Sequence, residues 1–345
     1  MTRRPRRRRR LAKKRVGRTH QIGLVFSIVL AGVLAVTAGW MYEGPGPKAR
    51  LGASTEVILP QKAGVTKIAG ALGRAGVIHS PAIFVIAAEL TGAAPRLKAG
   101  DYVIRSEASM AQIMRMIRAG AVARHFLTIP EGLSSQAVAD ILASRADLTG
   151  PADLAPEGSI LPETYEVRRG ETRAAVIGRM RAAQTDLLAD LWSRRAANLP
   201  FKTPDEAVTL ASIVEKETAK ADERPRIAAV FINRLGKGMR LETDPTVIYG
   251  LTGGRPLGHG LRVSELAKRT AYNTYQVAGL PPTPIGNPGK ASLVAALNPD
   301  KTDDLYFVAD GTGGHVFAAT FEEHQHNVAK WRTIEQARAR AGAQP

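Results

Sequence analysis

The most apolar stretch of the chain lies close to its N-terminus. Residues 22–41 contain no charged side chain, and Ser27 and Thr37 are their only hydroxyl residues. An α-helix rises about 1.5 Å per residue, so this stretch would extend about 30 Å, the thickness of a bilayer's hydrocarbon core. Trp40 and Tyr42 stand at its end, where aromatic rings favour the membrane–water interface. The pattern predicts a transmembrane helix over residues 21–42.

A cleaved signal peptide is the alternative interpretation of this stretch. Signal peptides have a shorter apolar region of about 7–15 residues, which ends in a small-residue cleavage site of the A-x-A type. Here the apolar region is longer, and the sequence at its exit, GWMYEGPGP, lacks such a site. We therefore expect the helix to be retained as a membrane anchor.

Residues 43–53 are rich in Gly and Pro, which is typical of a linker. Short strand patterns and longer helical patterns then follow in this order: a strand at 55–59, a helix from 65 to 77, a helix from 81, a strand at 102–105 and a helix at 110–118. Ser80 is the expected N-cap of the second helix, with Pro81 at its first position. The order predicts a βααβ module within a domain over residues 54–122.

The remainder of the chain, residues 123–340, alternates between helices and short extended segments, beginning with a strand at 125–129. Its loops are rich in Gly and Pro, as at 253–260 and 279–289. The last helix, about 321–339, is polar and becomes basic towards its end. We expect a second domain of mixed α/β structure and an α+β fold class for the whole chain.

The net charge of +17 suggests nucleic-acid binding, but its distribution argues against it. Residues 1–20 contain nine Arg and two Lys and no acid, which leaves +6 on the other 325 residues. A basic tail before an apolar span is a topology signal that keeps the tail in the cytoplasm. We therefore expect residues 43–345 to lie outside the cytoplasm. The chain has no cysteine, so this part must fold without disulfides.

The segment from Thr203 to Thr218 carries the strongest candidate chemistry. Thr203 and Glu206 form a capping-box pattern around Pro204, so a helix should begin here. Its C-terminal end carries Glu215 and Glu217, which two helical steps separate by about 200°. Glu217 shares a face with the residues three, four and seven positions before it, which are Val214, Ile213 and Leu210.

A carboxyl group on such an apolar wall has a raised pKa, as a general acid needs near neutral pH. The C-terminal end of a helix dipole acts in the same direction. The alternative is a structural glutamate paired with Arg224 or Arg234. Elsewhere the chain has no H-E-x-x-H, and its Gly-Thr-Gly-Gly segment is not followed by Gly-Lys-Ser/Thr. We therefore expect no metal and no organic cofactor.

Several longer motifs resemble the signature of the YceG-like endolytic murein transglycosylases. They are ASIVEKET (211–218), FINRL (231–235), GMRLETDPTVIYG (238–250), AYNTYQVAGLPPTPIGNPG (271–289), LYFVADGTGGHVF (305–317) and LPETY (161–165). The resemblance covers roughly residues 55–335. It implies a small LysM-like module, a larger catalytic domain and Glu217 as the catalytic acid/base.

The same resemblance suggests which loop residues contact a glycan. Polar and aromatic side chains suited to sugar hydroxyls and ring faces are Glu163, Tyr165, Asp244, Thr246, Tyr249, Tyr272, Asn273, Thr274, Tyr275 and Asn287. Asp-Pro, Asn-Pro and Gly-Asn are also ordinary turn formers, so a structural role stays open for each of these positions.

The resemblance implies endolytic cleavage of the MurNAc–GlcNAc bond in nascent peptidoglycan, which leaves 1,6-anhydroMurNAc ends and terminates strand elongation. The expected location is the bacterial inner membrane, with the catalytic domain in the periplasm and peptidoglycan synthases as partners. Two alternatives remain. One is a hydrolytic muramidase, for which Glu163 or Asp244 would be the second carboxylate. The other is a non-catalytic glycan-binding scaffold of the cell-wall machinery.

Overall fold

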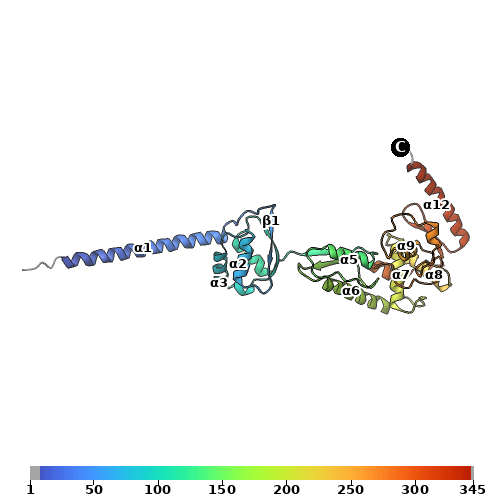
Figure 1. Ribbon diagram of the computed structural model, residues 1–345, viewed down its shortest axis with the longest axis horizontal. Helices are drawn as coiled ribbons and strands as arrows, with labels where there is room; N and C mark the ends of the chain where they lie inside the picture. Colours follow the sequence, from blue (N-terminus) through green and yellow to red (C-terminus); the bar gives the residue numbers. More distant parts are fainter. Residues whose placement is uncertain (1–7, 343–345) are drawn as a thin grey trace, which may run out of the picture. The chain divides into compact units, whose positions relative to one another are not determined.

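The computed structural model describes residues 8–342 and divides them into two compact units, which meet between Arg124 and His125 (Figure 1). The first seven residues of the predicted basic tail, and the last three of the chain, lie outside the described residues. Each unit has its own buried core, so each is described by itself.

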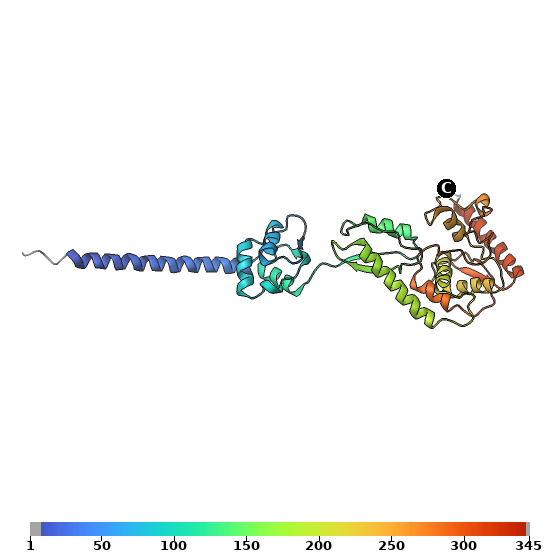
Figure 2. The ribbon, with the colours of Figure 1, turned by 60° about the horizontal axis from the view of Figure 1, so that its bottom comes forward.

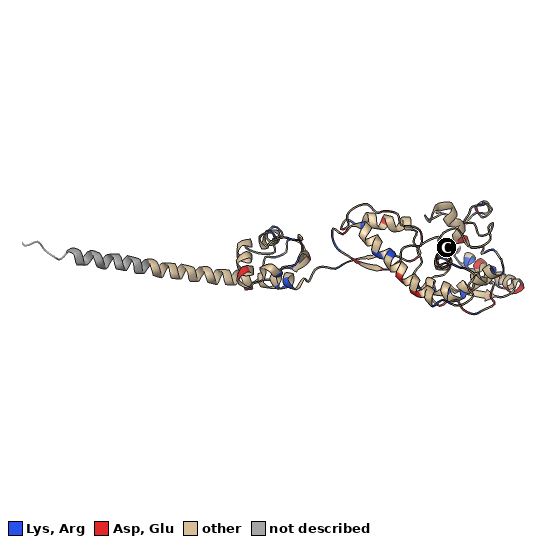
Figure 3. Ribbon diagram, turned by 90° about the horizontal axis from the view of Figure 1, so that it is seen from below, with Lys and Arg blue, Asp and Glu red and all other residues tan. Residues whose placement is uncertain are grey.

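Helix α1 (Arg8–Glu43) contains the predicted apolar span. Its segment Gly23–Glu43 is long and apolar enough to cross a membrane, and its side chains pack against nothing along most of that length. Figure 3 shows no charged residue along the described apolar part of α1, whereas charges are spread over both units. The helix starts at Arg8, so the described part of the basic tail continues the helix without a break.

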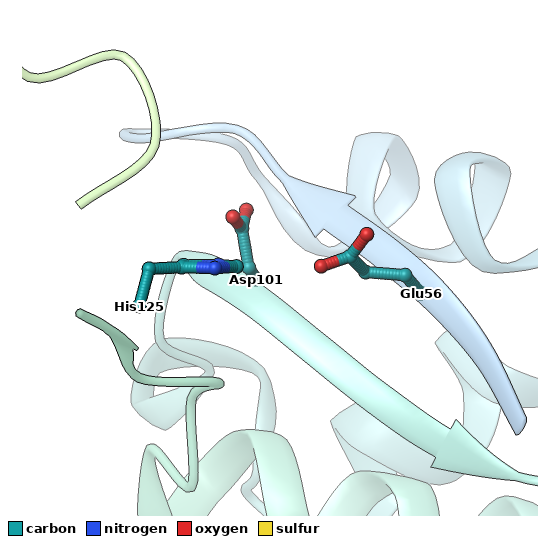
Figure 4. Close-up of side chains that lie close together, drawn as sticks. All are labelled: Glu56, Asp101 and His125. Carbon is teal, nitrogen blue, oxygen red and sulfur yellow. The ribbon is translucent and has the colours of Figure 1, made fainter. Parts of the chain in front are cut away.

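The first unit confirms the strand–helix–helix–strand order. Its elements are β1 (Ser54–Leu59), α2 (Val65–Arg74), α3 (Pro81–Leu90), the 3-10 helix η1 (Ala94–Arg96), β2 (Gly100–Arg105) and α4 (Met110–Ala119). β1 and β2 are antiparallel, with Val57 opposite Tyr102. Alternate residues of the two strands face the core, while Glu56 and Asp101 extend from the opposite face (Figure 4). Leu72 and Phe84 complete the core from the two helices.

Local signals determine where the helices of this unit begin. The Ser80 hydroxyl accepts a hydrogen bond from the amide of Ile83 at 3.4 Å, which makes it the predicted N-cap. The predicted linker differs from a free spacer, because backbone and side-chain hydrogen bonds fix it to the turn before α4. The amide of Gly46 donates to the carbonyl oxygen of Glu107 at 3.1 Å, and the amide of Ala49 donates to Ser106 Oγ at 3.0 Å.

The second unit begins with a small layer of helix and sheet. Its elements are β3 (His125–Thr128), α5 (Ser135–Ser144), β4 (Thr164–Val167) and α6 (Arg173–Ser193). β3 and β4 are antiparallel, and buried apolar residues such as Leu142 and Val176 fill the space between them and the helices.

The rest of the unit is mainly helical and encloses one central helix, α7 (Figure 2). Its elements are α7 (Pro204–Glu217), α8 (Arg224–Gly236), α9 (Asp244–Thr252), α10 (Val263–Leu266), α11 (Lys290–Leu297), β5 (Tyr306–Ala309), β6 (His315–Ala318) and α12 (Phe321–Gly342). α7 packs on α8 and α11 through buried residues such as Leu210, Phe231 and Leu293. The three sheets described each have two strands, which gives the mixed helix and sheet structure expected from the sequence.

Candidate active site

The central helix α7 carries the candidate acid at its last residue. The capping box is confirmed: Thr203 Oγ1 accepts from the amide of Glu206 at 3.3 Å, and Glu206 Oε2 accepts from the amide of Thr203 at 3.0 Å. All residues from Ala207 to Val214 are buried. The cap and this packing fix both ends of α7, so the carboxyl group of Glu217 has a defined position where the helix leaves the core.

Glu217 is half-buried, and its carboxylate accepts a hydrogen bond from the Thr243 hydroxyl. The pKa of Glu217 is raised, mainly because burial disfavours the charged form. The negative charge of Asp244 raises it further, whereas the Thr243 hydrogen bond, His315 and Arg234 act in the opposite direction. A carboxyl group that is raised in pKa and still reachable from solvent is suited to proton transfer.

Glu215 has a different environment two residues earlier. Its Oε1 accepts from Arg224 Nη2 at 3.0 Å, and its Oε2 accepts from the amide of Gly289 at 2.8 Å. The side chains of Glu215 and Arg224 are only 5% and 10% exposed. Glu215 therefore has both oxygens engaged in a buried ion pair and a backbone contact, which is a structural role.

These contacts change the argument that separates the two glutamates. Glu215 lies about 200° around the helix from the apolar face of Glu217, but residues 207–214 are all buried and the Glu215 side chain is buried as well. The partner, rather than the face, distinguishes them. Arg224 pairs with Glu215, and Arg234 donates to the carbonyl oxygens of Leu305 at 2.7 Å and Leu241 at 2.9 Å, so Glu217 has no ion-pair partner among the described residues.

Asp244 and Tyr275 stand beside Glu217, as the motif grouping predicts. Asp244 is exposed at the first position of α9, and its Oδ1 accepts from the Tyr275 hydroxyl at 2.8 Å. Burial raises the pKa of Tyr275, and the hydrogen bond to Asp244 and the charge of Glu217 add to the effect. This arrangement holds the Asp244 carboxylate in one orientation at the mouth of the site.

Three of the residues that were predicted to contact a glycan do not face solvent. Thr246, Asn273 and Thr274 are buried. Thr246 Oγ1 and Thr274 Oγ1 are 2.8 Å apart, and Thr274 Oγ1 accepts from the amide of Thr243 at 3.1 Å. Asn273 donates to the carbonyl oxygens of Leu266 and Lys268. In this structure they hold the backbone around Thr243 in place, so their predicted contact with a glycan becomes a supporting role.

Tyr249 and Tyr272 form a second cluster with Glu157. Their ring centroids are 5.0 Å apart, and the Tyr249 hydroxyl donates to Glu157 Oε2 at 2.9 Å. Burial raises the pKa of Glu157, which also accepts from the amide of Ser135 at 2.8 Å. Sequence reasoning missed Glu157, since a lone acid between Pro and Gly carries no pattern of its own.

Asn287 is fully buried and joins this cluster. Its Oδ1 accepts from the amide of Ile160 at 3.1 Å, and its Nδ2 donates to the carbonyl oxygen of Leu133 at 3.0 Å. Asn287 was predicted to contact the glycan directly. In the structure its side chain instead connects the segments around Leu133 and Ile160.

Glu163 directly precedes β4, and Tyr165 is the second residue of that strand. The Tyr165 hydroxyl donates to the carbonyl oxygen of Leu161 at 2.7 Å, and burial raises the Tyr165 pKa to about 12. Glu163 is exposed, and its charge contributes to the raised pKa of Glu131 rather than to that of Glu217.

His315 is the second residue that the sequence did not assign to the site. Its Nδ1 lies 2.8 Å from Glu223 Oε2, and its amide donates to Glu223 Oε1 at 3.0 Å. The Thr218 hydroxyl donates to the same carboxylate at 3.3 Å. Glu223 thus connects β6 to the residue after Glu217 and brings His315 close to the candidate acid. His315 belongs to the GGHVF motif, which is the sequence feature that could have pointed to this residue.

A cleft lies along the first half of α7, at the end of the helix opposite to Glu217. It has a volume of about 560 Å³, and its lining includes Glu157, Asp205, Thr209 and Pro282 but not Glu217. The only carboxyl group in its lining with a raised pKa, Glu157, is already hydrogen-bonded on both oxygens. This cleft therefore offers no carboxyl group with a raised pKa and a free oxygen.

Comparison with known proteins gives one family. Residues 57–330 match the YceG-like family. The chain is 30% identical over 315 residues to an endolytic murein transglycosylase from Bacillus subtilis, in an alignment that covers 81% of this chain and 85% of that protein. It is also 30% identical over 322 residues to an endolytic murein transglycosylase from Streptococcus pneumoniae, covering 79% of this chain and 57% of that one.

A solved structure is similar as well. The crystal structure of a yceG-like protein from Listeria monocytogenes matches with a TM-score of 0.50 and 29% identity, over 79% of this chain and 98% of that one. The family match over residues 57–330 agrees with the range of roughly 55–335 that the resemblance was expected to cover.

Proposed function

The chain belongs to the YceG-like family, and from that membership we propose that it is a peptidoglycan lytic transglycosylase with Glu217 as its acid/base catalyst. One observation carries the proposal. Glu217 is the residue at the end of a rigid, buried helix that combines a raised pKa, partial exposure and no ion-pair partner among the described residues. The murein substrate is that of the relatives named above.

A single carboxyl group is sufficient for this reaction. The protonated Glu217 donates its proton to the glycosidic oxygen between MurNAc and GlcNAc as the bond to C1 breaks. The resulting carboxylate then takes the proton from the C6 hydroxyl of the same MurNAc, whose oxygen closes on C1 to form a 1,6-anhydro ring. The attacking oxygen is already part of the substrate, so no water has to be positioned.

Asp244 could take part in this reaction or in the alternative reaction, hydrolysis by a muramidase. Its exposed carboxylate beside Glu217, oriented by Tyr275, can accept hydrogen bonds from glycan hydroxyls. In a hydrolytic muramidase the same group would activate a water molecule, since hydrolases use two carboxylates. The nature of the product separates the two reactions.

We expect the purified full-length protein to release fragments that end in 1,6-anhydroMurNAc. Each fragment should be lighter by one water than the product of hydrolysis, because the ring oxygen replaces the incoming water. Mass spectrometry of fragments from purified sacculi, before and after borohydride reduction, measures this difference directly. Reducible MurNAc ends would identify a muramidase and overturn the transglycosylase assignment.

The pH dependence of cleavage should report the charge of Asp244. Glu217 must be protonated to donate, so the rate should fall as pH rises through its raised pKa. Asp244→Asn removes the neighbouring negative charge that raises this pKa, and should move the alkaline limb of kcat/KM to lower pH. Glu242→Gln neutralises another exposed carboxylate of the same loop, which pairs with Arg234 at 3.4 Å, and should not move the limb to lower pH. If the alkaline limb of the kcat/KM profile stays at the same pH in Asp244→Asn, Glu217 is not the acid that titrates in that limb.

We propose that α1 anchors the protein in the inner membrane, with the basic tail in the cytoplasm and both units in the periplasm. In that location the enzyme meets nascent strands at the membrane, where cleavage ends their elongation and where the synthases that extend them are candidate partners. The βααβ unit, as a LysM-like module, would bind glycan without cleaving it.

A further inference from the structure

The first unit has an apolar helix with no protein partner on its outer face among the described residues. Phe84 and Ala88 of α3 face the core. On the opposite side Ala82, Ile86 and Leu90 follow one another at four-residue spacing, and Ile86 and Leu90 are 58% and 83% exposed. Glu89 is the only charged residue of this helix. An exposed apolar stripe of this kind marks a contact surface.

The position of α3 within its unit indicates what covers this stripe. α3 packs against the end of α1, and Figures 1 and 2 both show it running across that end, at the edge of the unit where α1 enters. The rings of Trp40 on α1 and His79, just before α3, are stacked with centroids 6.3 Å apart. The beginning of α3 is therefore at the level of the last turn of the apolar span.

The connection between α1 and this unit is tight. Tyr42, in the last turn of α1, packs into the unit's core and its hydroxyl contacts Met114 Sδ at 3.9 Å. The chain after α1 is fixed by the hydrogen bonds of Gly46 and Ala49 described above. One helical turn rises about 5.4 Å, and the interfacial layer of a bilayer is about 5–8 Å thick on each side. A helix held at the level of Trp40 lies within that layer.

The charges around the stripe fit a lipid surface. Arg74 precedes α3 in the sequence and Arg96 follows it, both exposed, whereas Lys98 donates to the carbonyl oxygen of Ala119 at 3.2 Å. Long basic side chains beside an apolar helix face extend toward lipid phosphates while their stems stay in the apolar region. An interfacial helix combines these features: an apolar face, basic flanks and an axis in the plane of the membrane.

We propose that α3 is a second membrane contact, whose Ala82–Ile86–Leu90 stripe inserts into the headgroup region of the leaflet from which α1 emerges. This inference rests on the proposed membrane location of α1. It gives the first unit two contacts with the same leaflet, so that the unit is held at a fixed height and does not rotate freely about α1.

The absence of native cysteine allows a direct test on the full-length protein. Single cysteines at Leu90 and Ile86 carry an environment-sensitive NBD label, and the protein is reconstituted into vesicles of phosphatidylethanolamine and phosphatidylglycerol. A label at Val103 is the matched control, because Val103 is an apolar, 45% exposed residue on the outer face of β2. A label at Leu34 in α1 reports the anchor.

We expect lipids with a nitroxide near the carboxyl end of the acyl chain to quench most of the emission at Leu90 and Ile86. Aqueous iodide should quench these labels several-fold less than the label at Val103. If iodide quenches the label at Leu90 as strongly as the label at Val103 while lipid quenches the label at Leu34, the inference is overturned. The anchor then remains supported. Protection from iodide without quenching by lipid would show that protein covers the stripe, and would overturn it too. An unquenched Leu34 would remove the anchor and this inference together.

Discussion

Replacing Glu217 by glutamine should lower the rate of glycan cleavage by about 10²–10⁴-fold, the range that general acid/base catalysis contributes. Glutamine keeps the size of the side chain and can still bond the Thr243 hydroxyl, but it cannot transfer a proton. Cleavage of purified sacculi, followed as released fragments, gives the rate. A variant that keeps its wild-type rate would show that Glu217 is not the acid and would favour the scaffold alternative.

The same substitution should not destabilise the fold. The pKa of Glu217 is higher in the folded than in the unfolded chain, so the folded wild type gains stability on protonation and loses it as pH rises through that pKa. Glutamine has no such dependence. The melting temperature of the variant should therefore equal that of the wild type at acid pH and exceed it increasingly as pH rises above about 4.5.

Glu215→Gln is the matched control. Its carboxylate is bonded to Arg224 and to the backbone of Gly289, so the substitution should lower stability while leaving cleavage far less affected than Glu217→Gln does. Assays at a temperature where both variants remain folded separate the two effects. An inactive Glu215→Gln beside an active Glu217→Gln would reverse the assignment of roles.

Removing the guanidinium of Arg224 should give the largest change in stability. Arg224→Met leaves the Glu215 carboxylate, 5% exposed, without its cation, and also removes the 3.5 Å contact with Glu131. Breaking a buried pair by removing one partner reduces the free energy of unfolding by about 3–5 kcal/mol. Urea unfolding of the detergent-solubilised chain at neutral pH measures the loss, as an earlier transition of the second unit.

The double variant Arg224→Met with Glu215→Gln tests the reason for that loss. It removes the unpaired charge as well, so it should recover a substantial part of the stability that Arg224→Met loses. If the double variant is less stable than Arg224→Met, the contribution of Arg224 lies in its packing and not in its charge.

The elements that sequence predicted well depend on neighbours within a few residues. The apolar helix α1, the caps at Ser80 and Thr203 and the βααβ order are of this kind, because hydropathy and capping patterns act locally. Glu217 was located by a motif together with a helical face. In the structure Glu215 is buried as well, so the two glutamates differ by the ion-pair partner that, among the described residues, only Glu215 has.

The features that sequence did not predict depend on contacts between distant segments. His315 reaches Glu223 across 92 positions of the chain, and Tyr249 reaches Glu157 across 92 as well. Thr246, Asn273 and Asn287 belong to polar motifs, yet the structure buries their side chains. A polar residue in a Gly- and Pro-rich loop faces a ligand or the protein interior depending on packing that a one-dimensional pattern does not contain.

The contacts of Asn287 also determine when the second unit can acquire its final form. Asn287 bonds to Ile160 and Leu133, which precede it by 127 and 154 residues. Closing loops of this length comes late in folding, because the chain entropy is lost before the contacts form. A chain synthesised from its N-terminus contains the 133–160 segment long before Asn287 is made. The loops that support α7 therefore stay unpaired until synthesis is nearly finished, so a chain that ends before Asn287 should lack a formed candidate site.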